Sequence, residues 1–165
     1  KDFFLSDIDD SKKLTQSNRV ALCNKLLLHC GVHVGIGLVS PQIIDKINIL
    51  QATKVAMAEA VLNLPVCPDH LLIDGLLLDS VSISQTKIIK GDSLSLSIAS
   101  ASIIAKVVRD TIMEEYDASE QKYGFARHKG YGTREHLNAL RKFGSSTIHR
   151  KSFSPVREMC AGGAI

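Results

Sequence analysis

Residues 71–110 read LLIDGLLLDSVSISQTKIIKGDSLSLSIASASIIAKVVRD, and this stretch decides the fold class. It contains two short segments that predict β-strands, the fully apolar residues 71–73 and residues 87–90 (KIIK). From Ile98 onward, apolar side chains recur at intervals of three or four residues, which predicts a long helix with one apolar face. Strands interleaved with helices favour an α/β layer fold.

The flanking sequence extends this α/β pattern in both directions. Residues 32–39 (VHVGIGLV) are rich in β-branched side chains and predict a further strand. Ser40 and Pro41 are suited to the N-cap and the first turn of a helix. The expected helices cover residues 14–29, 43–49, 51–64 and 133–143. We expect one domain over residues 1–165, because 165 residues of which 45% are hydrophobic can form a single core.

The composition excludes several classes of protein. No run approaches the roughly 18 uninterrupted apolar residues of a membrane span, and no signal peptide opens the sequence. The Gly-x-Gly at residues 35–37 lacks the third glycine of a dinucleotide fingerprint, and the histidines show no metal-ligand spacing. The four cysteines form no CxxC pair. We therefore expect reduced thiols in a cytoplasmic protein, with a disulfide framework as the alternative.

The charge is distributed unevenly along the chain. Residues 122–157 hold nine lysines and arginines and one acid, whereas the other residues hold 11 basic and 16 acidic side chains. A basic segment attached to an acidic body can bind a polyanion beside a carboxylate site. Charge alone favours the alternative of a solvated basic surface.

Two aspartates follow the predicted strands. Asp74 and Asp92 each lie next to a glycine and follow a short apolar segment. The carboxyl ends of strands in α/β sheets converge on a ligand-binding crevice, where paired carboxylates recruit a hard cation such as Mg²⁺. An Asp-Gly turn is the alternative, and spacing alone favours it.

Other polar clusters have both a functional and a structural interpretation. Ser11, Lys12 and Lys13 lie in a predicted loop where two lysines can hold phosphate oxygens, although a solvated loop has a similar composition. Asp110 lies four residues after Lys106 on the predicted long helix, a spacing that is typical of a surface ion pair.

The densest polar cluster, RHKGYG, covers residues 127–132. Arg127, His128 and Lys129 are three potential cations just before a predicted helix N-terminus, where free N–H groups attract phosphate. Tyr131, between two glycines, can stack on a sugar or bind a 2′-hydroxyl, the group that distinguishes RNA from DNA. A packed loop aromatic is an equally good interpretation of Tyr131.

Six motifs in the same order resemble bacterial ribonuclease HII. They are DDSKKLT (9–15), IDKINILQATKVAM (44–57), LLIDG (71–75), KGDSLSLSIASASIIAKVVRD (90–110), HKGYGTREHLNALRKFG (128–144) and IHRKSFSPV (148–156). The resemblance implies an RNase H-like fold, with a mixed sheet flanked by helices and a C-terminal helical region. It implies hydrolysis 5′ to a ribonucleotide in RNA–DNA hybrids and in duplex DNA with embedded ribonucleotides, with Mn²⁺ or Mg²⁺.

The resemblance also assigns roles to individual residues. Asp74 and Asp92 match the third and fourth metal-binding carboxylates of the family, and Tyr131 matches the tyrosine near the ribose. Asp110 is carried over as supporting structure. The residues of the matching basic motifs are expected to contact substrate: Ser11, Lys12, Lys13, Lys90, Arg127, His128 and Lys129.

One part of the family pattern is absent from this sequence. The family opens with a strand that bears an Asp-Glu pair followed by Gly-Arg-Gly, and no such motif occurs here. We therefore expect a partial sequence, active in its complete parent as a monomer and inactive alone. The alternatives are a non-catalytic nucleic-acid-binding fragment, an enzyme for a small phosphorylated molecule, and the related ribonuclease HIII, which prefers long hybrids.

Overall fold

The computed structural model describes residues 8, 12 and 14–161. The chain divides into two compact units, one formed by residues 1–38 and 54–108 and the other by residues 39–53 and 109–165. Helices α2 (Pro41–Leu62) and α4 (Leu96–Ser119) each contribute residues to both units. None of the helices in the described part of the chain combines the length and the apolar character of a membrane span.

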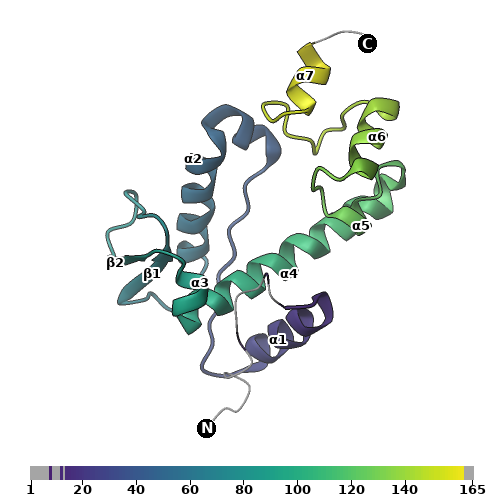
Figure 1. The fold of residues 1–165 in the computed structure, drawn as a ribbon. Coiled ribbons are helices and arrows are strands. Elements are labelled where there is room, and N and C mark those ends of the chain that lie inside the picture. Colours follow the sequence, from purple (N-terminus) through teal and green to yellow (C-terminus); the bar gives the residue numbers. More distant parts are fainter. Residues whose placement is uncertain (1–7, 9–11, 13, 162–165) are drawn as a thin grey trace. The chain divides into compact units, whose positions relative to one another are not determined.

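The core of the first unit lies between α1 (Gln16–Leu28) and the first half of α4 (Figure 1). Thr15 begins α1, because its side-chain oxygen accepts the Asn18 N–H at 3.2 Å. Leu26 and Ile103 are almost fully buried where the two helices pack. The helices predicted for residues 14–29 and from Ile98 onward are confirmed.

The sheet in the described residues is a parallel pair, β1 (His70–Asp74) and β2 (Ser84–Ile88). The predicted strand at residues 71–73 is confirmed. The second strand was predicted at residues 87–90, but it covers residues 84–88. Pairing stops at Ile88 because its register partner Asp74 is the last residue of β1. Lys90 then adopts a left-handed φ of 56° and leads into α3 (Gly91–Leu94), so Asp92 lies in a single helical turn and not at a strand end.

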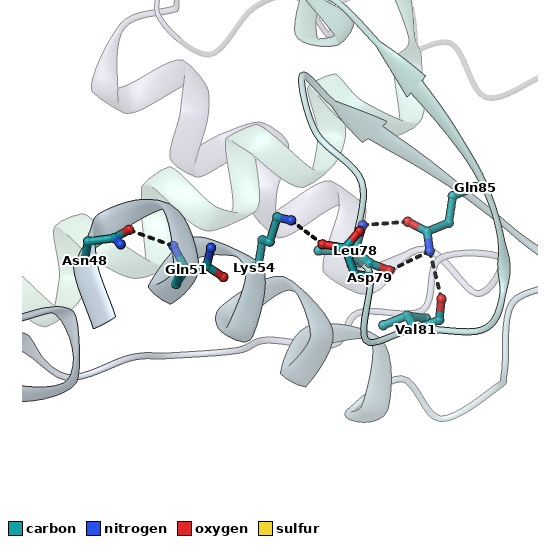
Figure 2. Close-up of polar contacts among 7 residues, drawn as sticks. All are labelled: Asn48, Gln51, Lys54, Leu78, Asp79, Val81 and Gln85. Carbon is teal, nitrogen blue, oxygen red and sulfur yellow. Dashed lines mark hydrogen bonds and ion pairs between the residues drawn. The ribbon is translucent and has the colours of Figure 1, made fainter. Parts of the chain in front are cut away.

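The connection between β1 and β2 is fastened by one side chain. The Gln85 carboxamide accepts the Leu78 N–H at 2.8 Å and donates to the carbonyls of Leu78 and Val81, both at 2.9 Å (Figure 2). Leu78 itself is buried. The loop therefore has an internal structure of its own.

Residues 32–39, predicted as a strand, form extended chain without ladder pairing. Gly35 and Gly37 let this chain touch α2, since an added Cβ would lie 2.0 Å from the Ala60 carbonyl oxygen and 1.9 Å from that of Ala56, respectively. Asn63, just after α2, also donates to the Ile36 carbonyl at 2.7 Å. The strand prediction was wrong because a helix, and not a neighbouring strand, covers this segment.

The two helices predicted at residues 43–49 and 51–64 form one element with a kink at Asn48. Asn48 has φ 66° and ψ 166°, and its side-chain oxygen accepts the N–H groups of Leu50 and Gln51 at 3.0 and 3.1 Å. Figure 2 shows the bond to Gln51. Asn48 therefore caps the second half of α2.

The second unit has an aromatic core built by short helical elements. They are η2 (Gln121–Tyr123), α5 (Phe125–His128), α6 (Arg134–Phe143) and α7 (Val156–Ala161). Tyr123 and Phe125 stack with centroids 5.2 Å apart and pack against Leu140 and Val156. Thr133 caps α6 through the His136 N–H at 3.3 Å, which confirms the helix predicted for residues 133–143.

The first turns of α2 hold the segment that precedes α7. The Asp45 carboxylate accepts the N–H groups of Lys151 and Ser152 at 2.8 and 2.9 Å, and Gln42 donates to the Thr147 carbonyl at 2.7 Å. The hydrogen bonds from Ser152 and Lys151 lower the pKa of Asp45, which keeps this clamp charged at neutral pH.

Candidate functional site

Asp74 lies at the C-terminal end of β1, where the chain leaves the sheet. Its Oδ1 accepts the Gly91 N–H at 2.9 Å. The Gly75 N–H donates to the Ile88 carbonyl at 3.0 Å, which closes the end of the parallel pair. Asp74 is therefore bonded to the backbone of the residue just before Asp92.

Asp92 is charged and held by a lysine. The Lys12 ammonium donates to its Oδ2 at 2.9 Å, and the Asp92 side chain is only 11% exposed. The hydrogen bond and the charge of Lys12 lower the pKa of Asp92, against the opposing effect of burial. Asp92 is therefore ionised at neutral pH.

The basic residues predicted near these carboxylates have different outcomes. The Lys12 side chain is 77% exposed although it pairs with Asp92. Lys90 is exposed at the turn that precedes α3. Ser11 and Lys13 lie outside the described residues.

The donor set of Asp74 and Asp92 fits a divalent cation in part. Carboxylate oxygens are the ligands that Mg²⁺ and Mn²⁺ prefer, and Mg²⁺ is often held by one or two carboxylates with water and phosphate oxygens. Within residues 8, 12 and 14–161, no group of three or more His, Cys, Asp or Glu side chains is arranged to hold a metal ion. The two aspartates can therefore supply part of a coordination shell.

In the second unit, the basic loop (residues 127–132) turns two of its three predicted cations inward. His128 is buried, and its ring nitrogens bond to the Tyr123 carbonyl and the Gly130 N–H. Lys129 is buried as well, and it donates to the Ala126 carbonyl at 2.7 Å and pairs with Glu114. These contacts favour a role for both residues in shaping the loop.

Arg127 differs from the other two cations because its side chain is 70% exposed. It pairs with Glu135 in the first turn of α6, and this pairing lowers the pKa of Glu135. Arg127 therefore presents its charge at the loop surface.

Tyr131 is 56% exposed and is placed by a residue that sequence patterns did not single out. The Arg109 guanidinium lies 4.8 Å from the centre of the Tyr131 ring and donates to the Lys129 carbonyl at 2.7 Å. The arginine thus contacts both the aromatic ring and the main chain of its loop. The only sequence signal for Arg109 was its place in the VVRD motif.

Asp110 is buried in α4, with its Oδ1 3.7 Å from the Arg109 guanidinium. A surface ion pair with Lys106 was the alternative interpretation, and the burial of Asp110 disagrees with a surface location. This position next to Arg109 is consistent with a supporting role.

Comparison with known proteins identifies the family. The profile of the ribonuclease HII family matches residues 3–156. Ribonuclease HII of Acetivibrio thermocellus is 53% identical over 154 residues, which cover 93% of this chain and 60% of the relative. Ribonuclease HII of Bacillus mycoides is 48% identical over 159 residues, which cover 96% of this chain and 61% of the relative.

A solved structure supports the same assignment at the level of the fold. The crystal structure of ribonuclease H2 from Pyrococcus horikoshii OT3 matches with a TM-score of 0.71 at 25% sequence identity, and covers 93% of this chain and 81% of that chain. The expected α/β class and RNase H-like fold are thereby confirmed. The chain spans about 60% of the length of the curated relatives described above, and it belongs to the ribonuclease HII family.

Proposed function

We propose that this chain carries part of the active site of an endoribonuclease. The enzyme hydrolyses the phosphodiester bond 5′ to a ribonucleotide in RNA–DNA hybrids and in duplex DNA with embedded ribonucleotides. The observation that carries the proposal is the hydrogen bond from the Gly91 N–H to Asp74, which ties one carboxylate to the residue before a second, ionised one. Family membership supplies the reaction class.

Asp74 and Asp92 would hold Mg²⁺ or Mn²⁺. When bound, paired divalent ions activate water and neutralise phosphate charge in phosphodiester hydrolysis. The protein's own contribution is to keep Asp92 ionised through Lys12 and to fix Asp74 against the Gly91 amide. Lys12, which is largely exposed, also has the reach to contact a phosphate oxygen.

Tyr131 would recognise the ribose. Its ring is more than half exposed, and Arg109 contacts the ring and fixes the preceding carbonyl. A hydrogen bond to the 2′-hydroxyl is the interaction that separates RNA from DNA at a single nucleotide.

The basic segment at residues 122–157 would bind the duplex backbone. Phosphate contacts provide much of the affinity of nucleic-acid-binding proteins without reading sequence. Arg127 and Lys90 are exposed and are suited to this role, whereas His128 and Lys129 would act through the shape of the loop. The family resemblance assigns substrate contact to Ser11 and Lys13 as well. We propose a cytoplasmic monomer with a single RNase H-like domain over residues 1–165.

The experiment needs the two further carboxylates that the family resemblance implies. The chain would be tested alone and after N-terminal extension with the corresponding segment of the Acetivibrio thermocellus relative. The substrate is an end-labelled DNA duplex with one ribonucleotide, incubated with Mg²⁺, Mn²⁺ or EDTA. We expect cleavage 5′ to the ribonucleotide only in the extended protein and only with metal.

Asp74→Asn in the extended protein tests the carboxylate directly. Asparagine keeps an oxygen for the Gly91 N–H but loses the negative charge, so we expect cleavage to be abolished. Duplex affinity should stay within about twofold, because phosphate contacts carry it. Asp69→Asn, at an exposed position outside the site, is the matched control. Near-normal turnover of Asp74→Asn would remove Asp74 from the proposed site.

The second candidate function is nucleic-acid binding without catalysis. It is favoured by the absence of a third metal-binding side chain from the described part of the chain. Salt-sensitive duplex binding by the extended protein, with no cleavage in either metal, would support this function and contradict the nuclease proposal.

A further inference from the structure

Three histidines are buried together beside the Tyr131 loop, in the second unit. His128, His136 and His149 are each less than 10% exposed. The rings of His128 and His136 stack with centroids 4.4 Å apart, and the Nε2 atoms of His136 and His149 are 3.1 Å apart. The function proposed above gives no task to His136 or His149.

The backbone around these rings determines where each proton lies. A backbone N–H can only donate and a carbonyl can only accept. The Ser146 N–H donates to Nδ1 of His149 at 2.9 Å, so the proton of neutral His149 is on Nε2. That Nε2–H donates to Nε2 of His136, whose own proton is on Nδ1 and donates to the Tyr131 carbonyl at 3.0 Å.

His128 holds the other side of the loop in the same way. Its Nδ1 accepts the Gly130 N–H at 3.2 Å, and its Nε2–H donates to the Tyr123 carbonyl at 2.8 Å. The main chain of Gly130 and Tyr131 is therefore bonded to two different histidine rings. These rings lie on separate elements, α5 and α6.

A second proton on His136 has no acceptor in this chain of hydrogen bonds, because it would lie on Nε2 and face the Nε2–H of His149 at 3.1 Å. A second proton on Nδ1 of His149 would face the Ser146 N–H, although the Ser146 hydroxyl at 2.9 Å can rotate to accept it. The Nδ1–H of His136 donates to the Tyr131 carbonyl in either case, so the arrangement favours the neutral pair and holds Tyr131 through His136.

The charged groups on the surrounding elements do not compensate for such a proton. Arg127 of α5 pairs with Glu135 of α6. Lys129 pairs with Glu114 of α4, and Tyr123 contacts the His149 ring at 4.9 Å. The hydrogen bonds of the three rings described above run to backbone, hydroxyl or imidazole groups: those of Tyr123, Gly130, Tyr131, Ser146 and the histidines themselves.

We propose that His136 and His149 are positioning residues for Tyr131: His149 fixes the tautomer of His136 that donates to the Tyr131 carbonyl. The inference rests on the proposed contact of Tyr131 with the ribose, and it names the residues that hold that contact in place.

The acidity of the pair agrees with this arrangement. Burial lowers the pKa of His149 from 6.5 to about 4, and burial also lowers the pKa of His136. The unfolded chain binds these protons more readily than the folded chain. The contribution of the neutral pair to the free energy of unfolding is therefore fully present above pH 6.5, and it falls as the pH drops from 6.5 toward about 4.

The proton positions can be measured without any substrate. Nitrogen-15 NMR of the histidine side chains at pH 7 should show protons on Nε2 of His149, Nδ1 of His136 and Nε2 of His128. A proton on Nδ1 of His149 or on Nε2 of His136 at pH 7 would overturn the proposal.

Two variants of His136 separate positioning from simple packing. The Asn side chain in His136→Asn keeps a donor for the Tyr131 carbonyl, so the Tyr131 amide signal should stay near its wild-type position at pH 7. His136→Ala removes the donor and should shift that signal. Exposed His33→Ala is the control and should change neither signal. Identical behaviour of the Asn and Ala variants would contradict a positioning role.

Binding shows whether the positioning serves recognition. The readout is the ratio of Kd for an all-DNA duplex to Kd for the same duplex with one ribonucleotide, measured on the extended protein. One lost hydrogen bond should lower this ratio about fivefold in His136→Ala, with recovery in His136→Asn. An unchanged ratio in His136→Ala would overturn the proposal. A wild-type ratio of one would refute the ribose contact itself, while the NMR spectra would still decide the hydrogen-bond network.

Discussion

At the scale of single residues, Gly35 and Gly37 lie at positions where the backbone of α2 leaves no room for a side chain. Both lie where extended chain touches the backbone of α2, and a Cβ on Gly37 would be 1.9 Å from the Ala56 carbonyl oxygen. The contact partner is backbone, so it cannot turn aside as a flexible side chain would. The Gly-x-Gly spacing therefore serves helix packing.

Gly37→Ala should lower the free energy of unfolding by about 3 kcal/mol or more, because overpacking against backbone forces the two segments apart. Gly132→Ala is the matched control, since nothing lies within 4 Å of its added Cβ, and it should change stability by less than about 0.5 kcal/mol. Urea unfolding followed by circular dichroism measures both. Equal stability of the two variants would show that the segment does not press on α2.

Residues of the candidate site could be predicted from sequence only where a local pattern marks them. Asp74 follows a short apolar strand, and the family motifs added Asp92 and Tyr131. Arg109 and His149 also lie in family motifs, but these gave them no role, because their partners lie 20 and 13 positions away in the sequence. The inward orientation of Lys129 depends on Glu114, which lies 15 positions earlier in the sequence.

At the scale of elements, helix positions followed from periodicity and caps, whereas strand positions did not. Thr15 and Thr133 mark helix starts that the sequence placed within one or two residues. A strand is defined by the neighbour with which it pairs, and no local pattern in residues 32–39 indicates that the neighbour of this segment is a helix. For the same reason β2 ends where β1 ends.

The kink in α2 gives a prediction for this scale. Asn48 has a backbone conformation that is nearly restricted to glycine, and it caps two N–H groups. Asn48→Ala should lower the free energy of unfolding by about 1 to 2 kcal/mol, because it loses the cap and keeps the strain. Asn48→Gly should stay within about 1 kcal/mol of the wild type, since glycine relieves the strain. Thermal unfolding decides, and an Ala variant as stable as the Gly variant would contradict the cap.

At the scale of the whole molecule, charge segregation is the property that sequence alone established most directly. Counting side chains sufficed to locate the basic segment at residues 122–157. Which of those charges face solvent required the structure, because Lys129 is buried while Arg127 and Arg134 are exposed.

Duplex binding should therefore depend steeply on salt. If about five phosphates are contacted, affinity should fall by about 10² to 10³ between 50 and 200 mM salt. Arg134→Gln should reduce the slope of log affinity against log salt by about 1, whereas Lys25→Gln on α1 should leave it unchanged. Fluorescence anisotropy with a labelled hybrid measures the slopes. Equal slopes for the two variants would exclude Arg134 from the phosphate contacts.

The parallel strand pair has a consequence for how the chain acquires its structure. Its register joins residues only 14 positions apart, as in His70 and Ser84, and Gln85 fastens the intervening loop to Leu78. Closing a loop of this length takes about 10 to 100 ns, far less than typical folding times. The pair therefore has a low contact order and loses little loop-closure entropy when it forms, so Asp74 is placed by contacts that are local in the chain.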